Sequence, residues 1–483
     1  MTTFNRPPTP GGPVKKSTCG GIGPTDDAEF RGNLAGRLAS RGNQDVFDQA
    51  ARPRFQFGHT EKTFRFWRGL VSRALSSHTT PFYLFSVTPL FDALTALKTL
   101  EAPFIQDTRG RSPHRQAIHI RHWLSCKTQP LPPLLQWWRQ QGNGIEVVSE
   151  FELCAALAEG FPPERILVNG PAKHAWLNRH PVRGLWVNFD SLTEARALCS
   201  LARKLSWRVG IRVHTTEEFD PENPGFPTQF GMQPTEAGEA LRTLKRSKVR
   251  LETIHFHLRT NVESPQIYQR ALAQVAHICR GARFSPKYVD CGGGLPPPNV
   301  LSPTGDAFDR NFALDELARR YARSLDQFPD ARELWLENGR FLSARSGVLV
   351  VGVRDAKERR GLRQLICDGG RTPHALISRW EAHEIFVLPE RRGPTRLTAV
   401  CGPTCMAFDQ IARRDLPRAV RPGDCLVWMN AGAYHLPWET RFSHGYAKVL
   451  WHDGRRISVA REAERFESWW GQWKNRACQP HPA

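Results

Sequence analysis

Four short segments combine residue types that phosphate binding and acid–base chemistry use. Residues 290–296, "DCGGGLP", hold three consecutive glycines, and residues 255–257, "HFH", hold two imidazoles. Residues 337–340, "ENGR", offer a carboxylate and a guanidinium, and residues 401–405, "CGPTC", offer two thiols. Bare backbone N–H groups can approach a phosphate closely, and arginine adds a charged donor. The residue types therefore predict a phosphate site with acid–base groups nearby, although no single segment identifies a reaction.

A lysine in the segment "LSCKTQP" is the candidate nucleophile. Lys127 follows an apolar run and precedes a proline-rich turn. Its amine could form a Schiff base with an aldehyde, but it is one of 67 Lys and Arg residues, so its type alone does not single it out. His255 and His257 lie on one face of a strand and could bind a metal, but a third ligand is missing from the motif range. We therefore expect no metal site.

Alternating strands and helices must position these groups. Between about residues 80 and 335, short apolar runs alternate with helical stretches such as "EFELCAALAEG" and "SPQIYQRALAQVAHICRGA". The strand candidates are 82–87, 145–149, 166–170, 184–191, 208–214, 251–258 and 287–294, and "ENGR" ends a further strand. Repeated β-then-α units over roughly 250 residues predict a parallel (β/α)₈ barrel, with its chemistry at the C-terminal ends of the strands.

The pattern changes after about residue 340, where strands separated by turns predict an all-β domain, a sandwich or a small barrel. The predicted organisation has four parts. They are a partly disordered N-terminal extension (1–78), the barrel (79–336, its first strand joining the β domain), the β domain (337–470) and a tail (471–483). Within the extension, 51–78 predicts an amphipathic helix with Phe66, Trp67, Leu70 and Leu75 on its apolar face.

Composition narrows the class of protein. The chain of 483 residues is 40% hydrophobic, and no run of about 18 apolar residues or secretory signal pattern appears, so we expect no membrane partner. Eleven scattered cysteines predict reduced thiols and a cytoplasmic location. The net charge of +20 invites a nucleic-acid role, but no nucleic-acid-binding motif accompanies it. We therefore expect a basic surface without a nucleic-acid partner.

Taken in order, the segments resemble a known family. "TPFYLFSVTPL", "LSCKTQPLPPLLQWWRQQGNGIEVVSEFEL", "FPPERILVNGPAK", "VNFDSLTE", "PTQFGM", "HFHLRT", "VDCGGGLP", "ENGRFLSARSG", "CDGG", "CGPTC" and "AGAYHLPW" are similar to segments of the fold-type III pyridoxal-phosphate decarboxylases, the group of diaminopimelate, ornithine and arginine decarboxylases. The resemblance covers about residues 80–455. It implies a barrel with a C-terminal β domain, as in alanine racemase, and pyridoxal 5′-phosphate as the cofactor.

The resemblance also implies roles for particular residues. Lys127 matches the Schiff-base lysine, Glu337 the partner of the ring nitrogen, and His257 the histidine that stacks on the ring. Glu146 matches an acidic residue near the lysine, where the family usually has Asp. The residues that match the phosphate site are Gly292, Gly293, Gly294, Thr260, Tyr434 and, from "ENGR", Gly339 and Arg340.

The family resemblance at one cysteine implies a dimer. Cys405 matches the cysteine that reaches the site from the other subunit and protonates the carbanion after CO₂ leaves. The resemblance therefore implies a homodimer whose two active sites are each built from both subunits. Cys401, in the same segment, is expected to serve packing.

Three departures from the family bear on the substrate. Arg259 replaces a glycine of the "HxGS" segment near the phosphate. Met406 stands where members acting on diamino substrates carry an acid, and Ser378 or Arg379 falls at a second amine-binding position. Without these acids, we expect a substrate side chain that is anionic, neutral or linked to a carrier, and not a simple diamino acid.

We therefore expect a pyridoxal-phosphate-dependent amino-acid decarboxylase. One alternative is a racemase or epimerase on the same barrel, against which the "CGPTC" segment speaks. A second is a catalytically inactive homologue that regulates a partner decarboxylase. Lys127, His257, Glu337 and Cys405 speak against inactivity, whereas Arg259 and Met406 keep it open.

Overall fold

The computed structural model describes residues 55–106, 118–220, 224–225, 227–374 and 380–474. All of these belong to one compact unit, Arg54–Ala483. The N-terminal extension was expected to be partly disordered over residues 1–78, and its residues 1–54 lie outside the described residues. Most of the predicted tail, residues 475–483, also lies outside them.

Eight parallel strands close into a barrel in chain order. They are β2 (His119–Ser125), β3 (Gly144–Val147), β4 (Ile166–Val168), β5 (Trp186–Phe189), β6 (Arg208–Arg212), β7 (Arg250–His255), β8 (Tyr288–Asp290) and β9 (Glu333–Asn338). This confirms the predicted fold class. Within the barrel, only β2, the apolar run before Lys127, was missing from the candidate strands.

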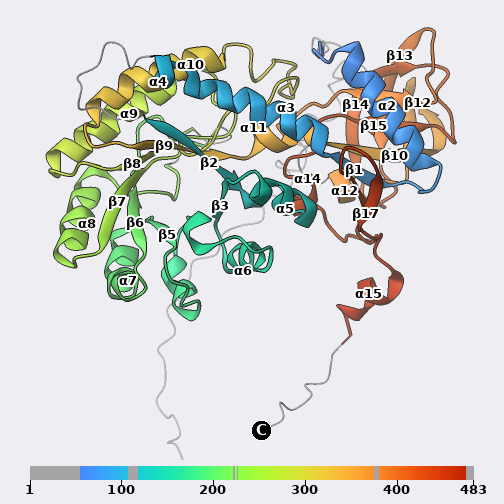
Figure 1. The fold of residues 1–483 in the computed structure, drawn as a ribbon. Coiled ribbons are helices and arrows are strands. Elements are labelled where there is room, and N and C mark those ends of the chain that lie inside the picture. Colours follow the sequence, from blue (N-terminus) through green and yellow to red (C-terminus); the bar gives the residue numbers. More distant parts are fainter. Residues whose placement is uncertain (1–54, 107–117, 221–223, 226, 375–379, 475–483) are drawn as a thin grey trace, which may run out of the picture. The chain divides into compact units, whose positions relative to one another are not determined.

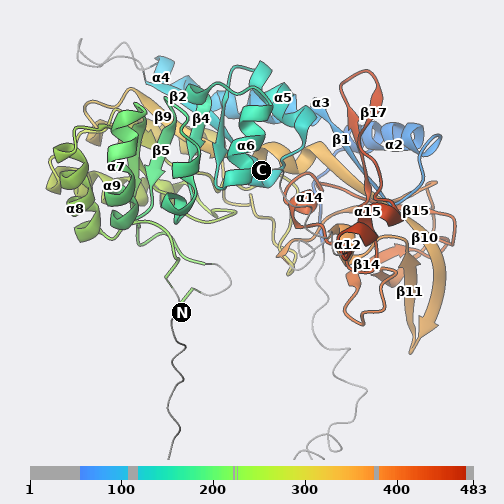
Figure 2. The same ribbon diagram turned by 90° about the horizontal axis from the view of Figure 1, so that it is seen from below.

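Helices cover the outside of the barrel (Figure 1). They are α3 (Val87–Lys98), α4 (Ala102–Gln106), α5 (Pro132–Gln140), α6 (Glu150–Ala158), α7 (Leu192–Lys204), α8 (Pro234–Arg246), α9 (Pro265–Gly281) and α10 (Leu314–Ser324). Four begin at a serine whose hydroxyl caps a backbone N–H: Ser86 before α3, Ser149 before α6, Ser191 before α7 and Ser264 before α9. Figure 2 shows α5, α6, α7 and α8 following one another around the barrel.

An aromatic layer fills the barrel below its mouth. Trp123, Trp186 and Trp335 form a buried cluster with Leu167, and the ring centroids of Trp335 lie 5.0 Å from Trp123 and 4.8 Å from Trp186. Because side chains alternate along a strand, residues two positions later share this inward face at the C-terminal end. For β2, β4 and β9 these residues are Ser125, Asn169 and Glu337. The polar groups of the barrel mouth therefore stand on a packed floor.

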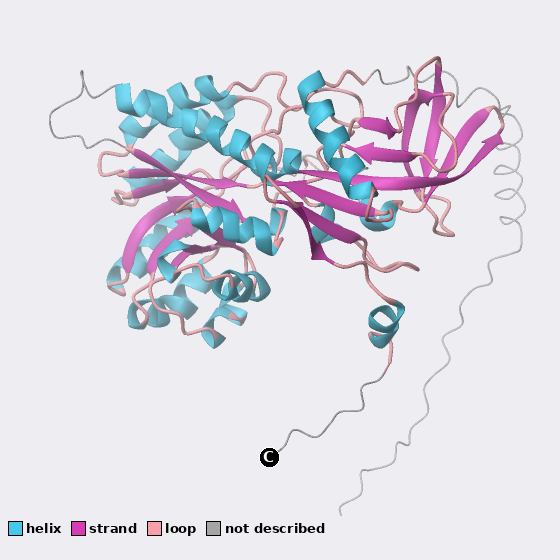
Figure 3. Cartoon of the chain, turned by 45° about the vertical axis from the view of Figure 1, so that its right-hand side comes forward, coloured by secondary structure: helices cyan, strands magenta, loops and turns pink. Residues whose placement is uncertain are grey.

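The second sheet has nine strands. They are β1 (Phe82–Ser86), β10 (Gly347–Arg359), β11 (Leu362–Cys367), β12 (Ile385–Leu388), β13 (Thr395–Cys401), β14 (Gln410–Pro417), β15 (Cys425–Trp428), β16 (Lys448–His452) and β17 (Ile457–Arg461). Strand β1 comes from before the barrel and pairs with β10 and β16. This part of the chain is rich in strands and poor in helices (Figure 3). The exact domain boundaries stay predictions.

Short helices and one long helix accompany this sheet. The short ones are α11 (Arg340–Ser343), α12 (Arg371–His374), α14 (His435–Trp438) and α15 (Phe466–Gly471). The long helix α2 (Glu61–Leu75) buries Trp67, Leu70, Val71 and Ala74 in a core cluster with residues of β1, β10 and β15. None of the helices in the described ranges is long and apolar enough to cross a membrane.

Candidate active site

Lys127 lies in a single helical turn at the end of β2, at the mouth of the barrel. The turn, Cys126–Thr128, is anchored by the buried Cys126, whereas the lysine side chain keeps 39% exposure and faces a cavity. Its Nζ is 3.9 Å from Oε1 of Glu146 on β3. Burial alone would lower the pKa of Lys127, but Glu146, Tyr434 and Glu337 raise it above its usual value. Without a bound aldehyde, the amine is therefore held protonated in the site.

Glu337 is the buried carboxylate of the site, near the end of β9. Oε1 accepts a hydrogen bond of 2.5 Å from Nδ2 of Asn169 and lies 3.3 Å from Nε2 of His255, and Oε2 lies 3.4 Å from Nδ1 of His257. Burial alone would raise the pKa of Glu337, but the two imidazoles and Lys127 outweigh it and hold the pKa well below its usual range. The carboxylate is therefore ionised and can face a protonated ring nitrogen.

Glu146 supplies a second buried carboxyl group. It accepts hydrogen bonds from Ser125 (2.5 Å) and from Asn169 (3.3 Å), so that Asn169 bridges Glu146 and Glu337. Burial raises the pKa of Glu146 to about 7, although Lys127 acts in the opposite direction. This carboxyl group can therefore hold or release a proton beside Lys127 near neutral pH.

The structure places a third candidate metal ligand beside the two histidines. No third ligand was found near His255 and His257 in the sequence, but Glu337 supplies one, since ligand atoms of the three residues lie within 4.8 Å of one another. Two imidazoles and a carboxylate suit several divalent metals. Asn169, however, already donates to the carboxylate of Glu337. The neighbouring small cavity is lined by glycines and favours a phosphorylated organic ligand over a metal ion.

A glycine-rich cradle lies beside these groups. Gly292 (φ +62°) and Gly294 (φ +101°) have left-handed backbones, and a Cβ on Gly293 would lie 2.6 Å from the carbonyl oxygen of Glu337. The three positions therefore favour glycine. Gly293 and Gly294 line a small cavity of about 60 Å³ with Thr260, Gly339, Arg340 and Tyr434, whereas Gly292 does not reach it.

Arg340 supplies the guanidinium of this small cavity. Its Nε donates to the Thr260 hydroxyl (3.1 Å), and its guanidinium lies 4.6 Å from the ring centroid of Tyr434. It also pairs with Glu381, a buried carboxylate that sequence reasoning missed. Backbone N–H groups, two hydroxyls and a guanidinium form a donor set that suits a phosphate.

A larger cavity of about 560 Å³ adjoins the small one and shares four lining residues with it, Lys127, His257, Thr260 and Glu337. This volume is in the usual range of about 300–1,000 Å³ for small-molecule sites. A phosphate in the small cavity would leave an attached ring between Lys127, His257 and Glu337. The residues present therefore fit pyridoxal phosphate.

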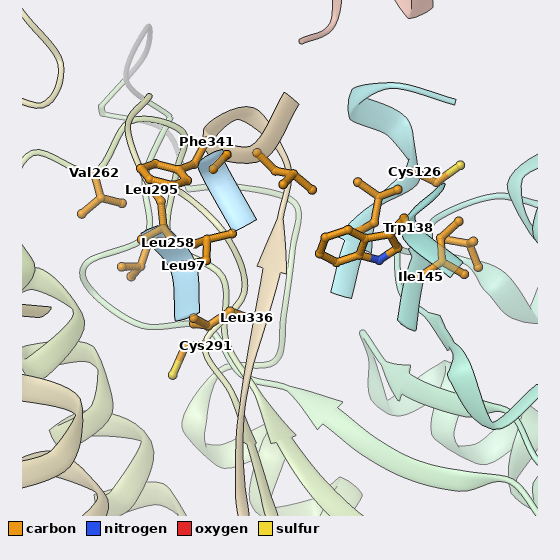
Figure 4. Close-up of a cluster of buried hydrophobic side chains, with 14 of the residues drawn as sticks. Leu97, Cys126, Trp138, Ile145, Leu258, Val262, Cys291, Leu295, Leu336 and Phe341 are labelled. Atoms are coloured by element: carbon orange, nitrogen blue, oxygen red, sulfur yellow. The ribbon is translucent and has the colours of Figure 1, made fainter. Parts of the chain in front are cut away.

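Buried apolar side chains fix the chemical groups from behind. Cys126 is next to Lys127 in the sequence, Leu258 to His257, Leu295 to Gly294, and Leu336 to Glu337. All of them belong to one buried cluster, together with Phe341 beside Arg340 (Figure 4). Because such a core is densely packed, the site is built on rigid supports.

The structure does not bring every expected residue to the cavities. Cys405 is exposed, Met406 is half-buried, and neither is among the described residues that line the two cavities. Ser378 and Arg379 lie outside the described residues. Arg259 lines the larger cavity and not the small one, so it does not enter the phosphate cradle.

Comparisons with known proteins agree with this geometry. Residues 110–344 match the family model described as pyridoxal-dependent decarboxylase, pyridoxal binding domain. Diaminopimelate decarboxylase of Methanothermobacter thermautotrophicus is 26% identical over 361 residues, covering 71% of this chain and 82% of the relative. The L-glutamyl-[BtrI acyl-carrier protein] decarboxylase of Niallia circulans is 26% identical over 388 residues, covering 74% and 84%.

A solved structure agrees in fold. Diaminopimelate decarboxylase from Helicobacter pylori, complexed with L-lysine, has a TM-score of 0.69 at 22% identity and covers 83% of this chain and 99% of that one. The family model spans the strands that carry Lys127, His257 and Glu337, together with the glycine cradle. The chain therefore resembles the fold-type III pyridoxal-phosphate-dependent decarboxylases in sequence and in fold, and pyridoxal phosphate is its cofactor.

Proposed function

We propose that the protein decarboxylates, as a homodimer, an amino acid whose side chain carries no free amine. The observation that carries the proposal is the convergence of Lys127, Glu337 and His257 on one cavity beside a phosphate cradle. Met406, in place of an acid, supports the restriction on the substrate. Among the relatives, one acts on a carrier-linked glutamyl group, although others are diaminopimelate decarboxylases.

When bound, pyridoxal phosphate supplies an electron sink that weakens bonds at the substrate Cα. The Nζ of Lys127 would hold the aldehyde carbon, and Arg340, Thr260 and the glycines would hold the phosphate. Glu337 would hold a negative charge beside the ring nitrogen, and the half-buried His257 would lie against the ring. Glu146 can accept a proton beside Lys127.

The proton that replaces CO₂ is assigned to Cys405 of the partner subunit. Its exposure in the single chain fits a residue that acts across an interface. Buried thiols such as Cys126 and Cys291 are poorer candidates, because burial raises the pKa of Cys126 above its usual value and that of Cys291 well above it. A cytoplasmic location stays a prediction.

An absorbance scan followed by a substrate panel tests the proposal. Purified protein with added pyridoxal phosphate should be yellow, and Lys127→Ala should lose the band, whereas Lys98→Ala, at an exposed lysine, should keep it. A colourless wild type would contradict cofactor binding through Lys127.

Carbon dioxide release is then measured with glutamate, side-chain-substituted glutamates, diaminopimelate, ornithine, lysine and arginine. We expect release from the substrates without a distal amine. Equal release from a diamino acid would contradict the role given to Met406. Inversion at Cα without CO₂ would indicate the racemase alternative.

A further inference from the structure

The larger cavity extends well beyond the place of the cofactor. The cofactor groups come from four neighbouring strands, β7, β8, β9 and β2. The rest of the lining stands over the other half of the barrel mouth, after β3, β4 and β6. It includes Glu146, Gly170, Arg212, Phe219, Asp220 and Phe230. This half of the cavity has room for more than a small amino acid.

Two phenylalanines, each backed by a buried arginine, form the walls of this half. The guanidinium of Arg259 lies 4.1 Å from the ring centroid of Phe219, and that of Arg212 lies 4.6 Å from Phe230. Both arginines are nearly buried, whereas both phenylalanines are half-buried and line the cavity. The cation–π contacts fix two flat apolar surfaces facing the ligand space.

Each arginine already has a carboxyl partner. Arg212 pairs with Glu218 at 2.7 Å, and Arg259 pairs with Glu263 and donates to the carbonyl oxygen of Glu217 at 2.8 Å. An anionic side chain would have to compete with these carboxylates. The remaining polar groups of the wall include the amide of Gln229, the hydroxyl of Thr228, which donates to Glu218, and the carboxylate of Asp220, and none of these three is a cation. Aromatic faces with neutral hydrogen-bonding groups suit an uncharged chain that contains amides.

The chemistry fixes where such a chain can be attached. In the proposed reaction the bond from Cα to its carboxylate breaks, CO₂ leaves, and Cα takes a proton, so the α-amine and α-carboxylate must be free. Only the side chain remains for attachment. We infer that this half of the cavity binds a neutral, amide-containing chain of the pantetheine kind, joined to the side-chain carboxyl of an acidic amino acid. The inference rests on the proposed function and narrows its substrate class.

Amide-linked conjugates test the inference. The test compound is γ-glutamyl pantetheine in which an amide replaces the thioester, and it is compared with free glutamate. The amide is chosen because a thioester would be lost by attack of the α-amine. We expect kcat/KM to be at least about 10-fold higher for the conjugate, since its chain would bury apolar surface against the two phenylalanines. Diaminopimelate and lysine form the contrasting arm, because each carries a distal ammonium group.

Variants of the wall separate this binding from folding and from catalysis. Phe219→Ala and Phe230→Ala should raise KM for the conjugate about 10-fold with little change in kcat, and leave glutamate kinetics unchanged. Phe466→Ala, at a phenylalanine 66% exposed and outside the cavity lining, is the matched control.

The outcomes distinguish the inference from the proposed function. Equal kcat/KM for glutamate and its conjugate, or equal losses on both in the wall variants, would overturn the inference while CO₂ release still supported a decarboxylase. A preference for the diamino acids would overturn the inference and the proposed restriction on the substrate. An absence of CO₂ from every compound would overturn the proposed function itself.

Discussion

Asn169 links the two acidic groups of the site. It donates to Glu337 at 2.5 Å and to Glu146 at 3.3 Å from the end of β4. Because Asn169 donates to both groups, it fixes their positions relative to each other. Their different pKa values come from the two imidazoles and Lys127 near Glu337 and from the burial of Glu146.

Arg340 is expected to contribute most to phosphate affinity. Because a hydrogen bond to a charged group contributes about 1.5–3 kcal/mol, Arg340→Ala should weaken pyridoxal phosphate binding about 10- to 100-fold. Arg340→Lys keeps a positive charge beside Glu381 but loses the fork, so its loss should be smaller. Absorbance titration of the cofactor-free protein measures both constants.

The exposed Arg359→Ala serves as the control for this titration. Wild-type affinity in Arg340→Ala would show that the glycine backbone alone holds the phosphate. The unfolding midpoint of the cofactor-free Arg340→Ala protein is measured as well. A lower midpoint than that of the wild type would report loss of the ion pair with Glu381, separately from the loss of phosphate binding.

Residues at the ends of strands were predictable from the sequence, whereas the distant residues that contact them were not. Lys127, His257 and Glu337 stand in short segments with distinctive neighbours. Asn169 meets Glu337 across 168 positions of sequence, and Glu381 meets Arg340 across 41, in a loop whose length could not be matched. That Arg259 lines the larger cavity and contacts Phe219 was also not predictable, because the two residues are 40 positions apart and meet only in the folded chain.

At the scale of elements, α2 completes the core of the second sheet. Trp67 is 2% exposed and packs with Phe82 and Leu84 of β1. Trp67→Ala should therefore lower the free energy of unfolding by about 3–5 kcal/mol, measured by urea denaturation. Arg65→Ala, on the exposed side of the same helix, should change it by less than about 0.5 kcal/mol. An unchanged midpoint for Trp67→Ala would show that α2 is dispensable for the sheet.

Three buried histidines meet where α12, α14 and the chain leading into β12 pack together. The ring centroids of His374, His383 and His435 lie 4.9–5.7 Å apart. Burial lowers the pKa of His383 to about 3, and it holds the pKa values of His374 and His435 well below the usual value. Nearby Arg340 acts in the same direction on His383 and His435. All three rings are therefore neutral in the folded protein.

This cluster makes the fold sensitive to acid. A histidine with a lowered folded pKa contributes stability that is fully present above pH 6.5 and is lost as the pH falls toward the folded value. His374→Phe removes one such group. Below pH 6.5 its free energy of unfolding should fall less steeply than that of wild type, by about 1.4 kcal/mol per pH unit.

Urea denaturation between pH 6.5 and about 5 measures this slope. The difference between variant and wild type above pH 6.5 reports packing alone and is the internal control. Parallel stability curves over the whole range would contradict a neutral His374 in the folded state.

At the scale of the whole molecule, exposed side chains bear on the proposed dimer. The proposed proton donor Cys405 is exposed, and Phe408 in the same loop is 60% exposed. Phe151, which follows β3 at the barrel mouth, is 87% exposed. Exposed aromatic side chains are enriched at subunit interfaces. A two-fold dimer that brings the Cys405 loop of one subunit to the barrel mouth of the other would cover both.

Subunit mixing tests this arrangement. Lys127→Ala and Cys405→Ala should each be inactive, because each removes one group from both sites of a homodimer. After subunit exchange, half of the dimers are mixed, and one of their two sites has both groups, so about one quarter of wild-type activity should return. Cys154→Ala, at another exposed thiol, should stay active and serve as the control. If Cys405 acted within its own chain, every site of a mixed dimer would lack one group, and the mixture would stay inactive.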